Sequence, residues 1–214
     1  MEQIFEARFL SARRAVIAAR FQNLNDMQRE GVLTTQGPLL LLAGAGSGKT
    51  TVLINRIANL LTYGRGSDCG EVPAGASEDD LAFLENYPAQ PTADERRRMR
   101  QLCAVEPPAP WQVLAVTFTN KAAQEMRSRI TQLVPPGYTN DFVCTIHGFC
   151  VRFLREEIHR LGYPKNFQIL DEEDMKSLAR HVLTENNTER SVKTVRQLLE
   201  ALAGTKDRKS TRLN

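Results

Sequence analysis

The sequence lacks the features of a secreted, metal-binding or membrane protein. Its 214 residues include four cysteines, none of them in a CxxC pair or at another metal-ligand spacing. This pattern argues against a disulfide framework and predicts reduced, partly buried thiols. No apolar run approaches the roughly 20 residues that a membrane-spanning helix needs, and the N-terminus has no signal-peptide pattern. We therefore expect a cytoplasmic protein with no membrane partner.

An excess of charge of one sign is also lacking. Lysine and arginine number 28 against 25 aspartates and glutamates. Three of the basic residues, Arg208, Lys209 and Arg212, fall in the last eight residues, DRKSTRLN. That string looks like the in-frame translation of a sequencing adapter, so residues 207–214 are interpreted as a non-native tail, with a genuine basic tail as the alternative. The net charge therefore gives no indication of nucleic-acid binding.

What the sequence does contain is a stretch suited to binding phosphate, LLLLAGAGSGKTTVL, at residues 39–53. Its apolar run, 39–42, is typical of a strand buried on both faces of a parallel sheet. The glycines that follow allow a tight turn whose backbone N–H groups surround an anion. Lys49 would place its charge on the β- and γ-phosphates, and Thr50 would supply a hydroxyl ligand for Mg²⁺. A helix should follow, its N-terminal dipole favouring the anion, with an apolar face formed by Leu53, Ile57 and Leu60.

This loop satisfies the pattern G-x-x-x-x-G-K-[ST] except at its first position, where Ala43 replaces glycine. The expected cofactors are ATP and Mg²⁺, with Lys49 and Thr50 acting in catalysis. The predicted ATP contacts from the loop are Ala43, Gly44, Ala45, Gly46, Ser47, Gly48, Lys49, Thr50 and Thr51.

The rest of the chain alternates strands with helices and then becomes helical. A helix is expected over residues 1–22, strands over 111–118 and 142–146, and helices after each strand, after Asp171, and at 195–203. Residues 64–110 hold six of the ten prolines and are too long for an ordinary connection. They are interpreted as an inserted surface element, with short helices beginning at Ser77-x-x-Asp80 and Thr92-x-x-Glu95. The order predicts an open parallel α/β sheet that leads into a helical segment.

Several stretches resemble the superfamily 1 DNA helicases of the UvrD/PcrA/Rep type. The stretch LNDMQ resembles their Q motif, and AGAGSGKT has their form of the P-loop, with alanine first. VTFTNKAAQEM, at 116–126, resembles their motif Ia, and TIHGFC, at 145–150, resembles motif Ib. NFQILDEEDM is similar to the entry into their helical 1B subdomain. The resemblance runs from about Leu24 to Asp174.

The resemblance implies a P-loop NTPase (RecA-like) fold, with a parallel sheet flanked by helices and followed by the start of a helical 1B subdomain. Residues 1–161 would form ATP-binding domain 1A with the insertion at 64–110, and residues 162–206 would begin 1B. ATP hydrolysis would drive 3′–5′ translocation on single-stranded DNA and unwinding at duplex junctions. The family's acidic motif D-E-x-x-Q and its second RecA-like domain are missing here, so this piece alone should not turn over ATP.

Carried onto this sequence, the resemblance assigns two groups of contacts. Gln28 would hydrogen-bond the adenine edge, although it also suits a helix cap with Asn25. The expected contacts with single-stranded DNA are Phe118, Thr119, Asn120, Lys121, Thr145 and His147. Phe118 could instead be a core aromatic, and Asn120 a helix cap. The basic run in the insertion could touch DNA, but such a run is usually a solvated face; it consists of Arg96, Arg97, Arg98 and Arg100.

Other interpretations stay open beside this one. ILDEED, 169–174, could be an acidic Mg²⁺-binding strand, but its place in the chain favours a capped helix start at Asp171. Thr51 stands where family members often carry an arginine near the nucleotide, so one contact could be missing. Alternative functions are a helicase–nuclease subunit of the RecB/AddA type, a nucleotide-binding module without hydrolysis, and an unrelated P-loop kinase.

Overall fold

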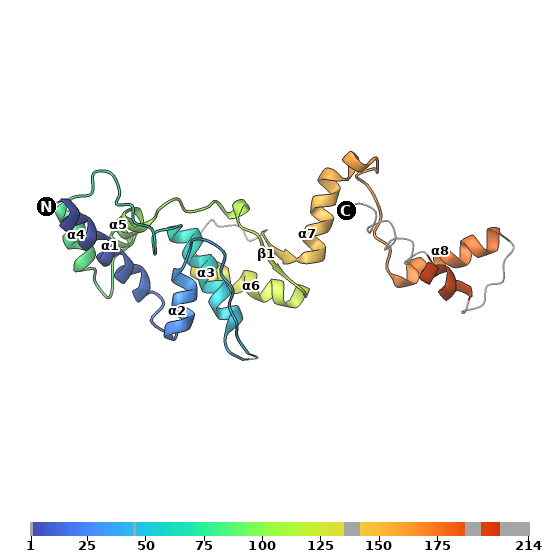
Figure 1. Cartoon of the computed structure of the whole chain (residues 1–214), viewed down its shortest axis with the longest axis horizontal. Coiled ribbons are helices and arrows are strands. Elements are labelled where there is room, and N and C mark those ends of the chain that lie inside the picture. Colours follow the sequence, from blue (N-terminus) through green and yellow to red (C-terminus); the bar gives the residue numbers. More distant parts are fainter. Residues whose placement is uncertain (1, 45, 135–141, 187–193, 202–214) are drawn as a thin grey trace. The chain divides into compact units, whose positions relative to one another are not determined.

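A computed structural model of the chain describes residues 2–44, 46–134, 142–186 and 194–201. The chain divides into two compact units, Met1–Arg152 and Phe153–Asn214, which are treated separately below (Figure 1). The elements that lie wholly in the first unit are α1 (Glu2–Ala19), α2 (Asp26–Leu33), α3 (Lys49–Tyr63), α4 (Glu78–Glu85), α5 (Ala93–Cys103), the 3₁₀ helix η1 (Pro110–Gln112), β1 (Ala115–Thr117), α6 (Asn120–Leu133) and β2 (Val143–Thr145).

The predicted insertion forms two helices that pack on the N-terminal helix. Ser77 caps α4 and Thr92 caps α5, each in a capping box as the sequence predicts. Their apolar residues do not stay at the surface, because Leu81, Leu84 and Cys103 are buried in one core with Phe9 and other residues of α1. The insertion therefore contributes to the hydrophobic core of this unit.

A buried arginine ties α1 to the segment that precedes α4. Arg13 is fully buried, and its Nη1 and Nη2 each donate a hydrogen bond of 2.6 Å, to the carbonyls of Glu71 and Cys69 respectively. At the surface, Arg8 donates to both carboxylate oxygens of Glu85 at 3.1 and 2.9 Å. Two planar guanidinium groups thus hold α1 and the insertion together in a defined register.

The second core lies between α3, α6 and a small sheet. Strands β1 and β2 are parallel neighbours, with Ala115 opposite Val143 and Thr117 opposite Thr145. Met126 and Ile130 of α6 pack with Ile57 of α3 in this core. In Figure 1, α3 lies between α2 and α6, which agrees with its contacts to both helices. The strands predicted at 111–118 and 142–146 are confirmed, although each is shorter than expected.

The strand predicted at Leu39–Leu42 is wrong for the described residues. No strand is assigned there, and neither β1 nor β2 pairs with it. Leu40 and Leu42 are 79% and 87% exposed. Leu41 comes close to α2, where a Cβ added at Gly31 would lie 3.0 Å from Leu41 Cδ2. A strand needs a hydrogen-bonded neighbour to satisfy its backbone, and no described strand pairs with this run.

Helix α3 confirms the helix expected after the loop, but its buried face differs from the prediction. Ile57 is buried as expected, whereas Leu53 is 37% exposed. The buried positions Val52 and Ile54 point instead into the two cores that flank the helix. A helix covered on two sides buries a wider stripe than a single amphipathic face, which explains the shift.

The C-terminal unit is helical. Helix α7 (Ile146–Glu157) begins in the first unit and is followed by η2 (Ile158–Leu161). Neither has a fully buried residue; on the predicted apolar face, Cys150 is exposed and Leu154 and Ile158 are half-buried. Helix α8 (Glu172–Glu185) begins at its cap Asp171 as predicted. Residues 194–201 are also helical, and Val195 packs there on Ala179 and Leu183 of α8. The tail at 207–214 lies outside the described residues.

The cysteines are thiols, as the sequence predicts. Cys69, Cys103 and Cys144 are buried and Cys150 is exposed. Burial raises the pKa of the Cys103 thiol to about 12, so it stays protonated and unreactive at neutral pH. In the part of the chain that the structure describes, no helix has the length and apolarity needed to cross a membrane.

Candidate nucleotide-binding site

The glycine-rich loop ends directly at the first turn of α3. Gly48 is the N-cap of this helix, with φ of 82°, and Gly46 also has a positive φ, of 75°. A side chain at position 48 would be strained there, and its Cβ would lie 2.7 Å from Gln28 Nε2. The chain therefore turns into a helix whose first backbone N–H groups are free to meet an anion.

The side chain of Lys49 folds over this loop. Its Nζ donates hydrogen bonds to the carbonyls of Ala43 at 2.9 Å and Gly44 at 2.5 Å. Ser47 Oγ also donates to the Gly44 carbonyl, at 2.7 Å. The ammonium group and the helix N-terminus thus gather positive charge at one place, while the hydroxyl-bearing Thr50 beside them is exposed. Ala45 lies outside the described residues.

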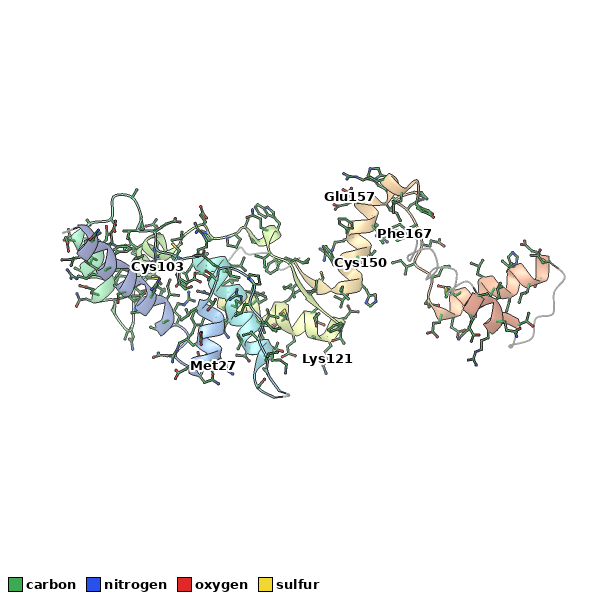
Figure 2. The ribbon with its side chains drawn as sticks, viewed as in Figure 1. Met27, Cys103, Lys121, Cys150, Glu157 and Phe167 are labelled. Atoms are coloured by element: carbon green, nitrogen blue, oxygen red, sulfur yellow. The ribbon has the colours of Figure 1, made fainter. Side chains whose placement is uncertain are left out.

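A cavity of about 450 Å³ opens beside the loop. Its size lies within the range of small-molecule sites, which are mostly apolar with a few placed polar groups. The walls come from Leu40–Leu42, from the start of α2 including Met27 and Gln28, and from Lys49. Met27, labelled in Figure 2, marks the α2 side of this cavity.

Gln28 connects α2 to the loop. Its Oε1 accepts a hydrogen bond from the Asn25 backbone N–H at 3.2 Å, and Asn25 Oδ1 accepts one from Gln28 N at 2.9 Å, which completes a capping box. Gln28 Nε2 donates to the Ser47 carbonyl at 3.0 Å. The helix-cap role of Gln28 is confirmed, and its role toward adenine stays a prediction.

The predicted DNA contacts lie at the carboxyl ends of the two strands. Phe118 follows β1 and is 88% exposed, so it is not a core aromatic. Thr119, rather than Asn120, is the N-cap of α6, since its Oγ1 accepts a hydrogen bond from Ala122 N at 3.2 Å. Because β1 and β2 are parallel, the residues that follow them share one edge of the sheet.

The remaining predicted contacts flank this edge. Thr145 ends β2 and its Oγ1 accepts a hydrogen bond from Gly148 N at 3.1 Å. His147 and Lys121 are exposed, and Lys121 is labelled at the start of α6 in Figure 2. The structure therefore brings the predicted DNA residues together, although their contact with DNA stays a prediction.

Three of the four arginines of the basic run have partners within the insertion, the first being Arg96, which donates to the Pro91 carbonyl. Arg97 forms an ion pair with Asp94, and Arg98 pairs with Asp80 at 2.7 Å. Arg98 also lies 4.5 Å from the centre of the Phe83 ring. These local partners favour the interpretation of the run as a solvated face.

Asp171 and Asp174 are also held by local hydrogen bonds. Asp171 Oδ1 accepts from Asp174 N at 2.8 Å, and Asp174 Oδ2 accepts from Asp171 N at 3.2 Å. The stretch 169–174 is thus the capped start of a helix, as predicted, and not a strand. Among the described residues, no group of three or more His, Cys, Asp or Glu could hold a metal ion.

Comparison with known proteins identifies the family. The family model described as the UvrD/REP helicase N-terminal domain matches residues 24–68 and 96–214. The chain belongs to the UvrD/REP helicase family. The resemblance inferred from the Q motif, the P-loop and motifs Ia and Ib is therefore confirmed. The matched ranges leave out all of α1 and all of α4, which pack on each other.

The chain is also similar in sequence to ATP-dependent DNA helicases named PcrA. The chain is 36% identical over 184 residues to the ATP-dependent DNA helicase PcrA of Bacillus subtilis, covering 86% of this chain and 19% of that protein. It is 35% identical over 193 residues to PcrA proteins of Staphylococcus epidermidis and Staphylococcus aureus, covering 90% of this chain and 21% of theirs. The chain thus spans about a fifth of the length of these relatives.

Sequence reasoning missed one residue beside the loop. Arg129 of α6 donates from Nη2 to Thr51 Oγ1 at 3.2 Å, although the two residues are 78 positions apart. The helical spacing of Met126 and Ile130 could have placed Arg129 on the edge of the buried face of α6. No pattern in the sequence indicates which residue of α3 it would meet.

Proposed function

We propose that this chain is the ATP-binding part of a 3′–5′ DNA helicase, which couples ATP hydrolysis to translocation on single-stranded DNA and to unwinding at duplex junctions. The observation that carries the proposal is the glycine loop, which ends at the N-terminus of α3 with Lys49 folded over it. Membership of the UvrD/REP helicase family and the names of its PcrA relatives support it.

In this proposal ATP lies with its phosphates on the loop from Ala43 to Thr50. Lys49 would exchange its two carbonyl partners for phosphate oxygens, and the backbone N–H groups of the first turn of α3 would donate to the same phosphates. Thr50 fits Mg²⁺, which prefers oxygen ligands and is usually shared with phosphates. The bound Mg²⁺ would neutralise charge on the β- and γ-phosphates. The cavity beside Gln28 is the place for the nucleoside.

DNA would follow the edge formed by the ends of β1 and β2. Phe118 offers an exposed ring on which a base can stack, and aromatic stacking tolerates any sequence. In this proposal, the sugar–phosphate backbone of the DNA passes Thr145 and His147, which lie at the end of β2 and just after it. We expect weak binding that falls steeply with salt, as for other contacts with phosphates.

Nucleotide binding without hydrolysis is a second candidate for the chain of residues 1–214. The observation that favours it is that Asp171 and Asp174 form the capped start of α8. The stretch 169–174 is therefore not the acidic strand that the sequence offered as an alternative for Mg²⁺ binding and water activation. Steady DNA-stimulated release of phosphate by this chain would contradict it. The parent protein would still be an ATP-dependent helicase.

Replacement of Gln28 by alanine should reduce the preference for ATP over GTP. The amide pairs a donor and an acceptor, which suits the adenine edge, so we expect a roughly tenfold smaller ratio of the two affinities. Competition binding with both nucleotides measures this ratio. Asn25→Ala is the control, because it weakens the same helix cap by about 1 kcal/mol and leaves the Gln28 amide in place. An equal change in both variants would mean that Gln28 acts only as a cap.

Replacement of Phe118 by alanine should weaken binding of single-stranded DNA. Loss of one stacked base is worth about 1–3 kcal/mol, and the ring is exposed enough to stack without any rearrangement. A fluorescence titration with a labelled oligothymidine at low salt measures the effect. Arg97→Ala, on the insertion, is the matched control and should change the affinity less than twofold by order of magnitude. A larger effect of Arg97→Ala would place DNA on the insertion instead.

A further inference from the structure

A second cation lies beside the first turn of the helix that begins at the P-loop. Arg129 Nη2 is 3.2 Å from Thr51 Oγ1, and Thr51 directly follows Thr50 in that turn. The Arg129 side chain is 39% exposed and also pairs with Glu125 at 3.4 Å. The guanidinium is therefore partly open to solvent and held at two points.

Its position is fixed by a packed interface. Met126 and Ile130, which flank Arg129 on α6, are buried at 4% and 0% exposure. They share a core with Ile54 and Ile57 of α3. Because this core sets the two helices against each other, the Arg129 side chain begins close to the N-terminal turn of α3 and needs little ordering to stay there.

Without a bound anion, the positive charge at this turn is only partly compensated, by the ion pair of Arg129 with Glu125. A helix N-terminus carries a partial positive charge and prefers acidic residues nearby, yet the first turn of α3 contains no acidic residue. Lys49 already contributes one positive charge at the same turn, and its partners are the neutral carbonyls of Ala43 and Gly44. A third source of positive charge makes physical sense where a highly charged anion binds.

We propose that Arg129 is a positioning residue for the nucleotide phosphates. Its guanidinium, held at Thr51, adds a fixed positive charge beside the loop and stabilises the bound polyphosphate through charge. This inference rests on the proposed binding of ATP at residues 43–50. In this inference, the Thr51 hydroxyl accepts the hydrogen bond that positions Arg129 of α6.

The test is a binding titration of a non-hydrolysable Mg²⁺–ATP analogue to the 214-residue chain. Arg129→Gln should weaken binding roughly tenfold at low salt, and the loss should shrink to roughly two- or threefold at 0.5 M salt because mobile ions screen the charge. Arg129→Lys keeps the charge and should stay within about threefold of the unsubstituted chain. A merely structural contact would produce neither the salt dependence nor the rescue by lysine.

Arg127→Gln is the matched control on the same helix. Arg127 donates from Nε to the Val143 carbonyl at 3.0 Å, on the β2 side of α6, so its replacement removes the same charge from a side chain that bonds to β2. Equal affinities for Arg129→Gln and Arg127→Gln, or a loss that salt does not reduce, would overturn the role of Arg129 alone. Absence of binding by the unsubstituted chain would overturn the ATP site and this inference together.

Discussion

The Lys49→Ala chain is expected to lose detectable binding of a Mg²⁺–ATP analogue. Lys49 is the one residue of the loop that combines a full charge with a place over the loop itself, 2.9 Å from the Ala43 carbonyl. Each charge-assisted hydrogen bond to phosphate contributes about 1.5–3 kcal/mol, so loss of two of them weakens binding by at least roughly a hundredfold. Calorimetry at micromolar protein concentration measures the loss.

Lys121→Ala provides the control for this experiment. It removes the same positive charge from Lys121, an exposed residue at the start of α6 that we propose contacts DNA. The two variants should separate the two ligands, with Lys49→Ala affecting the nucleotide and Lys121→Ala affecting only DNA. Unchanged nucleotide affinity in Lys49→Ala would remove the P-loop assignment and the function built on it.

Local features of this chain could be predicted from the sequence. The helix caps at Asn25, Ser77, Thr92 and Asp171 were all predicted, and each forms a capping box in the structure. A cap joins residues three positions apart, so the pattern and the structure contain the same information. The loop at Gly48 is predictable for the same reason, because its geometry depends on neighbouring glycines.

Features that join distant segments could not be predicted. Apolar residues at 39–42 indicate burial, but they do not reveal whether a neighbouring strand is present to pair with them. The cap of α6 shows the same limit on a smaller scale, because Thr119 and Asn120 both suit an N-cap and only the path of the chain after β1 selects Thr119. Arg129 meets Thr51 through helix packing, which no spacing in the sequence encodes.

The insertion illustrates this limit most clearly. Its proline content and length predict a surface element, and its helices were predicted from their caps. The sequence does not show that α4 and α5 bury Leu81 and Met99 against α1, because that contact joins segments about 70 to 90 residues apart. The core formed by α1, α4 and α5 lies in the first unit and draws on residues 69–95, which the UvrD/REP helicase family model does not match.

Arg13→Met is expected to lower the free energy of unfolding of the first unit by about 3 kcal/mol. Methionine can fill much of the buried volume, but it cannot donate to the carbonyls of Cys69 and Glu71, which the guanidinium holds at 2.6 Å. The buried Cys69 carbonyl left without a donor costs about 1–3 kcal/mol, and the part-buried Glu71 carbonyl costs less. Urea unfolding followed by circular dichroism measures the change, with Arg13→Met and the unsubstituted chain compared at the same protein concentration.

Arg14→Met is the matched control, one position along α1. Arg14 donates to the Asp68 carbonyl at 3.4 Å in an exposed contact, and loss of such a contact usually changes stability by less than about 0.5 kcal/mol. Hydrogen exchange adds a local readout, since Arg13→Met should speed exchange in α4 and α5 more than in α6, which belongs to the other core. Equal stabilities of the two variants would mean that Arg13 does not set the register, and that apolar packing of Leu81 and Leu84 with the Arg8–Glu85 ion pair holds α1 to the insertion.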